Sequence, residues 1–251
     1  MKLTRLQDKW KAGENGLNGW CSIPSTFSAE ILSLAGFDSI TIDLQHGLVD
    51  YQTALGMLQA IGASGVTPIA RVPWNEPGII MKLLDAGALG IICPMVNTAQ
   101  DAADFVGAMR YAPQGYRSSG PTRAAIIHGA NYHHEANDTL VSFAMVETKE
   151  AFDNVDEIAA TDGLTGIYVG PSDLSVSMGY NPGLDRKEAE MDDMFGAILA
   201  SCKKHGIKCG IHCGTAEYAN SAFERGFDFA TLASDVRLLS VGIDAAIKQI
   251  K

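Results

Sequence analysis

The sequence predicts a single (β/α)8 TIM barrel domain over residues 1–251, and three observations indicate it. Short apolar runs alternate eight times with segments of helical periodicity. The connections between these segments are short, except for one excursion at residues 110–138. Polar side chains recur just after the apolar runs end, where a parallel barrel gathers its functional groups. A doubly wound sheet would also alternate, but no glycine-rich dinucleotide turn follows the first run.

Strands are expected where four to eight apolar and β-branched residues are bounded by turn signals, a pattern typical of strands covered on both faces. The eight expected strands cover residues 16–23, 38–43, 67–72, 89–93, 141–146, 164–169, 208–212 and 227–232. The expected helices cover residues 29–35, 48–63, 77–86, 98–109, 149–160, 173–178, 187–205, 216–225 and 236–251. The first of these helices has an N-cap candidate in Ser25 and is ended by Gly36.

Composition and charge narrow the class of partner. The net charge of −10 argues against a nucleic-acid backbone, because phosphates need a basic surface. No apolar run is long enough to span a membrane, and residues 1–15 lack the apolar core of a signal peptide. The five scattered cysteines suit a reduced protein better than a disulfide framework. We therefore expect a cytoplasmic protein whose partners are small molecules.

Two carboxylates follow neighbouring strands of the predicted barrel. Glu147 comes directly after the run 141–146, and Asp173 lies shortly after the run 164–169. A helical segment separates the two runs, so the strands should be parallel and both carboxylates should face one cleft. There they could share a hard divalent metal ion. The alternative is that both are solvated loop acids.

Three further polar residues are expected at the same edge: Asp43, His46 and Arg71. Arg71 can stabilise charge that develops on an enolate oxygen, and His46, oriented by Asp43 or acting through a bound water, can move protons. The backbone amides of Ser172 and Asp173 begin a helix and could bind a carboxylate. A 2-oxo acid fits this arrangement, with the metal acting as a Lewis acid on its ketone. The alternatives are a rim ion pair for Arg71 and a helix cap for His46.

No lysine is expected inside the barrel, which argues against a Schiff-base aldolase. Lys208 opens a strand at the opposite end, and Lys149 begins a helix. The metal route is therefore preferred.

Two groups of metal-binding residue types are weaker signals. The excursion carries His128, His133 and His134, for which surface histidines are the preferred interpretation. The segment from Cys209 to Cys213 could be a soft-metal site, but its residues alternate along one strand and no second ligand pair follows.

Five motifs in order along nearly the whole chain resemble the HpcH/HpaI aldolase family. They are Ile42-Asp43-Leu-Gln-His46-Gly, Ala70-Arg71-Val-Pro-Trp-Asn, Arg110-Tyr-Ala-Pro-Gln-Gly-Tyr-Arg117, Val146-Glu147-Thr and Val169-Gly-Pro-Ser-Asp173-Leu-Ser. The resemblance implies a metal-dependent class II aldolase that cleaves a 4-hydroxy-2-oxo acid reversibly into pyruvate, or hydroxypyruvate, and an aldehyde through a metal-stabilised enolate. It also implies a homohexamer, a trimer of dimers, whose last helix is exchanged between subunits.

The resemblance also implies roles for individual residues. Glu147 and Asp173 would bind the ion, which we expect to be Mg²⁺, Mn²⁺ or Co²⁺. Arg71 would contact the pyruvyl oxygen, and His46 paired with Asp43 would transfer protons. The remaining assignments from the resemblance are the backbone of Gly170 and Ser172 for the pyruvate carboxylate and Asp85 for a neighbouring subunit's site. We also expect Trp20 and His212 to bind the substrate.

Three positions depart from the family pattern: Gln45, Met145 and His212. We expect His212 to line the aldehyde pocket and to favour short hydroxylated aldehydes, because an imidazole offers a donor and an acceptor. The alternative is a histidine packed against the neighbouring strand with its nitrogens bonded to the backbone. Other open functions are a 2-oxo acid decarboxylase or acyl-CoA lyase using the same metal enolate, and a non-catalytic 2-oxo acid binding protein.

Overall fold

The computed structural model describes residues 4–250 and confirms the predicted (β/α)8 barrel. Eight parallel strands pair in chain order, and β8 pairs with β1 to close the barrel. The strands are β1 (Gly16–Cys21), β2 (Ser39–Asp43), β3 (Thr67–Arg71), β4 (Gly90–Cys93), β5 (Val141–Val146), β6 (Gly166–Val169), β7 (Lys208–Cys213) and β8 (Phe229–Leu232).

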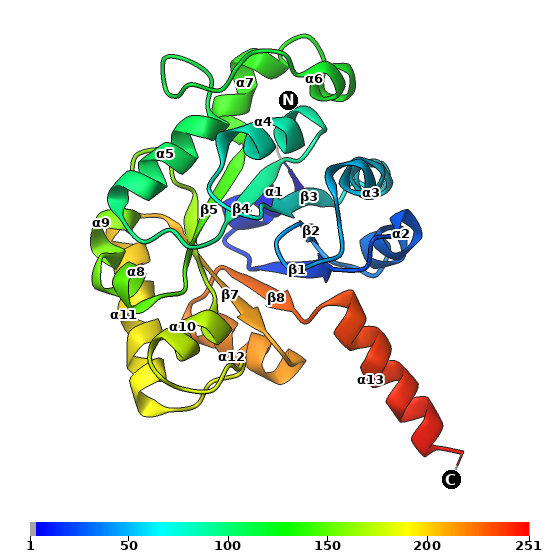
Figure 1. Cartoon of the computed structure of the whole chain (residues 1–251), viewed down its shortest axis with the longest axis vertical. Coiled ribbons are helices and arrows are strands. Elements are labelled where there is room, and N and C mark those ends of the chain that lie inside the picture. Colours follow the sequence, from blue (N-terminus) through cyan, green and yellow to red (C-terminus); the bar gives the residue numbers. More distant parts are fainter. Residues whose placement is uncertain (1–3, 251) are drawn as a thin grey trace.

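Helices surround the barrel on its outside (Figure 1). They are α1 (Arg5–Lys11), α2 (Thr26–Ser33), α3 (Tyr51–Ala63), α4 (Pro77–Asp85), α5 (Ala99–Met109), α6 (Thr122–His128), α7 (Tyr132–Thr139), α8 (Lys149–Asp153), α9 (Val155–Ala159), α10 (Pro171–Ser177), α11 (Ala189–His205), α12 (Ala216–Arg225) and α13 (Asp235–Lys248). The apolar sides of α2 to α12 pack against the strands in one continuous core, whereas α1 packs against residues inside the barrel.

The helices differ from the expected pattern in three places. Helix α1 was not expected, although Thr4 and Gln7 form a capping box at its start. Helices α6 and α7 lie within the excursion that was expected to be a loop. The helix expected at residues 149–160 is two helices, because the Asn154 side chain donates to the Asn97 carbonyl and the backbone turns there.

The interior of the barrel is closed at its amino-terminal end. Trp10 of α1 lies edge-on to Phe143 and Phe229, with ring centroids 6.0 Å away in each case. Leu6 of α1 is fully buried against Gly16, where an added Cβ would lie 2.2 Å from the leucine side chain. A small molecule can therefore reach the interior only from the carboxyl ends of the strands.

The last helix leaves the barrel and projects outward (Figure 1). Its start is fixed by buried Asp235, which accepts hydrogen bonds from the backbone N–H groups of Ser22 and Ile23 and from the Ser28 hydroxyl. Beyond Asp235, apolar side chains that are 40–85% exposed cover the helix and the residues after it: Val236, Leu238, Leu239, Val241, Ile243, Ile247 and Ile250. Lys251, which ends the expected helix, lies outside the described residues.

All five cysteines are buried free thiols. Within residues 4–250, no helix has the length and apolar character that crossing a bilayer requires.

We predict that Asp235→Ala lowers the free energy of unfolding by about 1–3 kcal/mol, because two partly buried backbone N–H groups lose their acceptor. Urea denaturation at one fixed protein concentration measures this, since assembly makes stability concentration-dependent. Asp244→Ala, on an exposed position of the same helix, is the matched control and should change stability by less than about 0.5 kcal/mol. Equal effects of the two substitutions would contradict the anchoring role.

Candidate active site

The carboxyl ends of five strands surround a cavity of about 320 Å³. It is lined by His46, Arg71, Met145, Glu147, Gly170, Pro171, Ser172, Asp173, Leu184 and His212. Most of the residues singled out in the sequence therefore come together at one place. Asp43 and Trp20 lie behind this lining, and Asp85 lies elsewhere.

Arg71 is held in place by Asp43. The two residues are paired in register on β3 and β2, and the guanidinium donates from Nε to Oδ1 at 2.9 Å and from Nη2 to Oδ2 at 2.7 Å. Burial alone would raise the pKa of Asp43, but the hydrogen bonds and charge of Arg71 outweigh it and leave the pKa below its usual range. The ion pair that the sequence analysis gave as an alternative role for Arg71 is therefore present, and Arg71 also lines the cavity.

Trp20 completes the surroundings of this ion pair. Its indole Nε1 donates to Asp43 Oδ2 at 3.2 Å, and the Arg71 guanidinium lies 4.8 Å from its ring centroid. Trp20 is only 2% exposed and supports Arg71 from behind. A direct contact of Trp20 with substrate stays a prediction.

His46 lies in the exposed loop after β2 and reaches the cavity. Its backbone N–H donates to Asp43 Oδ1 at 3.3 Å, as does the N–H of Gln45 at 3.0 Å. The imidazole itself makes no hydrogen bond to any residue between 4 and 250. Asp43 therefore fixes the loop and Arg71, while pairing of the His46 ring with Asp43 stays a prediction.

Glu147 is almost fully buried at 1% exposure. Its Oε1 accepts a hydrogen bond from the Met95 N–H at 2.8 Å, and Met95 adopts a positive φ of 53° that aims this N–H at the carboxylate. Burial raises the pKa of Glu147 to about 7, and the negative charge of Asp173 adds to the rise. The Met95 hydrogen bond and the charge of Arg71 oppose this rise only in part, so a further cation would stabilise the two carboxylates.

Gly170 leaves room for that carboxylate. A Cβ added to Gly170 would lie 2.5 Å from Glu147 Oε2 and 2.9 Å from Glu147 Cβ. The glycine is therefore required by the close approach of Glu147, and the backbone at this point stays open to the cavity.

The residues fit a hard divalent ion that takes other ligands from solvent or substrate. Glu147 and Asp173 supply two carboxylates to the cavity, and an ion such as Mg²⁺ commonly uses one or two. No cluster of three or more His, Cys, Asp or Glu side chains suited to a metal occurs in the described part of the chain. The soft-metal alternative at Cys209–Cys213 thus finds no support. In the excursion, His128 stacks on Tyr132 and His133 stacks on Tyr111.

Asp85 is not part of this cavity. It ends α4, which runs back from the carboxyl end of β3 toward the amino end of β4, and it forms an ion pair with Arg117 at 2.6 Å. Its approach to a neighbouring subunit's site stays a prediction.

Leu184 is a lining residue that the sequence did not indicate. It lies in the connection between α10 and α11, and the adjacent Asp185 accepts hydrogen bonds from the Gly214 N–H and the Thr215 hydroxyl, both at 2.7 Å. These bonds tie the connection to the end of β7. No local signal marks Leu184, because its place depends on this long-range tie.

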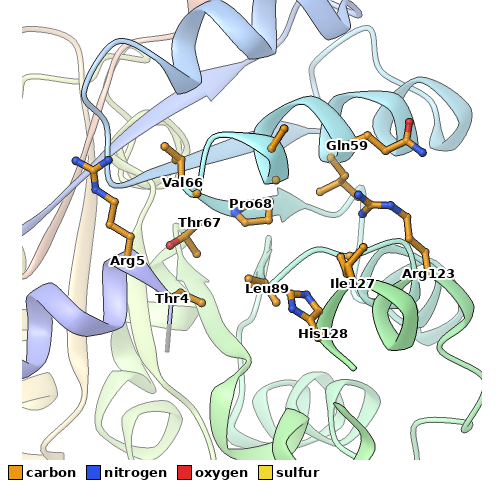
Figure 2. A pocket seen from close by; sticks show the side chains of 15 residues that line it. Thr4, Arg5, Gln59, Val66, Thr67, Pro68, Leu89, Arg123, Ile127 and His128 are labelled. Atoms are coloured by element: carbon orange, nitrogen blue, oxygen red, sulfur yellow. The ribbon is translucent and has the colours of Figure 1, made fainter. Parts of the chain in front are cut away.

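A larger cavity lies at the other end of the barrel and holds none of the predicted site residues. It measures about 640 Å³ and is lined by parts of α1, α3 and α6, including Arg5, Gln59 and Arg123 (Figure 2). Size alone therefore does not identify the site; the convergence of charged side chains does.

Fold and site together define a (β/α)8-barrel protein with a buried arginine and two carboxylates at the carboxyl ends of its strands. The profile of the HpcH/HpaI aldolase/citrate lyase family matches residues 20–241, and the chain belongs to this family.

Named relatives agree with this assignment. The hydroxypyruvate/pyruvate aldolase of Rhizorhabdus wittichii is 40% identical over 248 residues, covering 99% of this chain and 97% of the relative. The 4-hydroxy-2-oxo-heptane-1,7-dioate aldolase of Salmonella heidelberg is 36% identical over 245 residues, covering 96% and 92%. A crystal structure of a HpcH/HpaI aldolase/citrate lyase family protein from Burkholderia cenocepacia superposes with a TM-score of 0.91 at 31% identity, covering 98% of each chain.

We predict that Gly170→Ala displaces the Glu147 carboxylate and lowers kcat/KM for the reaction proposed below by about tenfold or more, because a misplacement of about 1 Å in an active site has costs of this size. Steady-state kinetics, with circular dichroism to verify folding, provide the measurement. Gly196→Ala in α11, where an added Cβ meets nothing within 4 Å, is the matched control and should leave activity unchanged. Wild-type activity of Gly170→Ala would show that the close approach is not needed.

Proposed function

We propose that this protein is an aldolase that cleaves a 4-hydroxy-2-oxo acid reversibly into pyruvate or hydroxypyruvate and an aldehyde. The observation that carries the proposal is the Arg71 guanidinium, fixed by Asp43 and facing the same cavity as Glu147 and Asp173. This cavity offers a positive charge for a developing enolate and two carboxylates for a cation. The names of the family relatives support the same carbon–carbon lyase chemistry.

Arg71 acts on the oxygen of the 2-oxo group. Cleavage of the bond between C3 and C4 leaves negative charge on that oxygen, and a preorganised guanidinium stabilises it without reorganising. Asp43 and Trp20 keep the guanidinium in position, since both of its hydrogen-bonded nitrogens are held by one carboxylate. The backbone of Gly170 and Ser172 receives the substrate carboxylate beside it.

His46 handles the proton of the 4-hydroxyl group. Its ring reaches the cavity from a loop whose backbone is tied to Asp43, so the loop is fixed while the imidazole forms no hydrogen bond to any residue between 4 and 250. In the cleavage direction it removes this proton, and in the aldol direction it returns it to the aldehyde oxygen.

Glu147 and Asp173 would hold a divalent ion such as Mg²⁺, Mn²⁺ or Co²⁺. When bound, the ion would polarise the 2-oxo group as a Lewis acid. It would also neutralise the two carboxylates, since burial, together with the charge of Asp173, raises the pKa of Glu147.

Assembly into a homohexamer, with α13 exchanged between subunits, belongs to the same proposal. The exposed apolar side chains of α13 support it, because a projecting helix with such a surface is expected to be covered. Asp85 would then approach a neighbouring subunit's cavity. The buried free cysteines support a reducing, cytoplasmic location.

We predict that the protein releases pyruvate from a 4-hydroxy-2-oxo acid, measured by coupling to lactate dehydrogenase. Exhaustive chelation should abolish turnover, because the carboxylate pair then holds no ion, and added Mg²⁺, Mn²⁺ or Co²⁺ should restore it. Full activity after chelation would contradict the role of the ion.

The same assay separates the alternative functions. Release of carbon dioxide without an aldehyde would indicate a decarboxylase, and turnover only with a thioester would indicate an acyl-CoA lyase. Binding of pyruvate without turnover under any metal condition would indicate a 2-oxo acid binding protein.

A further inference from the structure

His212 lines the cavity from β7, and its ring is held on two sides. It lies in register with Thr231 of β8, and its ring centroid is 4.8 Å from that of Trp20 in an edge-on arrangement. Its Nδ1 is 3.1 Å from the Tyr168 hydroxyl oxygen. The expected placement of His212 at the cavity is therefore observed, but its partner is a side chain and not the backbone.

Hydrogen bonds inside the barrel determine which atom of this pair donates. The Asn18 carbonyl oxygen accepts from the hydroxyls of Ser39 and Thr41, so the Asn18 amide nitrogen is the atom that donates to Thr231 Oγ1, at 2.9 Å. The Tyr168 hydroxyl also donates to Thr231 Oγ1, at 2.6 Å. The proton of Tyr168 is thus committed, and its oxygen can only accept from His212 Nδ1–H.

The histidine is also kept neutral. Burial, helped by the positive charge of Arg71 and opposed in part by Asp43, lowers the pKa of His212 to about 4. A neutral imidazole carries one proton, which is on Nδ1. The other nitrogen, Nε2, is then a bare acceptor, and no residue in the described range 4–250 donates to it.

Given the proposed function, we propose that His212 determines specificity by accepting a hydrogen bond, through Nε2, from a hydroxyl group of the substrate. The cavity wall also includes the apolar side chains of Met145 and Leu184, which cannot hydrogen-bond a hydroxyl group as His212 Nε2 can. An apolar substrate group would leave Nε2 desolvated and unpaired, whereas a hydroxyl satisfies it. Tyr168, Thr231 and Asn18 are positioning residues that set the tautomer.

The hydroxyl can belong to either reactant, so the kinetic test varies one reactant at a time. Hydroxypyruvate is compared with pyruvate, and glycolaldehyde is compared with acetaldehyde. We expect His212→Phe, which keeps a ring of similar shape, to reduce the preference for the hydroxylated member of one pair by about tenfold or more, mainly through KM. The pair that changes identifies the reactant.

His134→Phe, at an exposed position of α7, is the matched control and should leave both preferences unchanged. Tyr168→Phe removes the acceptor of Nδ1–H and should weaken the preference less than His212→Phe does. Unchanged preferences in His212→Phe for both pairs would overturn the proposal.

A second measurement does not depend on turnover. Nitrogen-15 NMR of histidine-labelled protein should show His212 with a protonated Nδ1 and an unprotonated Nε2 at neutral pH, and Tyr168→Phe should mix the two tautomers. Protonated Nε2 in the wild type would overturn the proposal even if the variants fail to fold. If the protein cleaves no 4-hydroxy-2-oxo acid, the proposed function fails. The tautomer of His212, and the affinities for hydroxypyruvate and pyruvate measured by calorimetry, still test whether Nε2 accepts a hydrogen bond.

Discussion

A guanidinium buried at the end of a β-strand needs a carboxylate beside it, and Asp43 meets this need for Arg71 through two hydrogen bonds. The pairing follows from the register of β2 and β3, which sets the two residues opposite one another. Trp20 packs on the guanidinium and bonds to the carboxylate, and the backbone after β2 is tied to the same oxygens. The positive end of the cavity therefore depends on a single ion pair.

The barrel interior is layered from its closed end to the cavity. Trp10, Phe143 and Phe229 form the apolar floor. Above it, the Asn18 amide and the Tyr168 hydroxyl both donate to Thr231 Oγ1. The Tyr168 oxygen then accepts from His212 Nδ1–H. Buried polar groups are costly unless satisfied, so these hydrogen bonds fix the orientation of the His212 ring and leave only its Nε2 without a partner among residues 4–250. The outermost layer presents charges, and a histidine acceptor, to one small cavity.

The sequence was most informative where a function depends on position along a strand. Glu147, Asp173 and Arg71 were predictable because the ends of parallel strands must converge. The hydrogen bonds between Asp43 and Arg71 were not, since they depend on the register of β2 and β3. Leu184 and the Tyr168 hydrogen bond depend on contacts between residues far apart in sequence. Helix α1 had a local signal, its capping box, that apolar periodicity alone does not reveal, whereas the break at Asn154 goes with a hydrogen bond to Asn97, far away in the sequence.

The central claim is that Asp43 acts by holding Arg71. A double-mutant cycle with Asp43→Asn, Arg71→Met and the double variant, read out as kcat/KM for aldol cleavage, tests it most directly. Loss of Arg71 should cost on the order of 10²-fold, as for one oxyanion donor. If the account is correct, Asp43→Asn costs nearly as much and the double variant is no worse than Arg71→Met alone. Losses that multiply would contradict it and would show that Asp43 acts independently of Arg71.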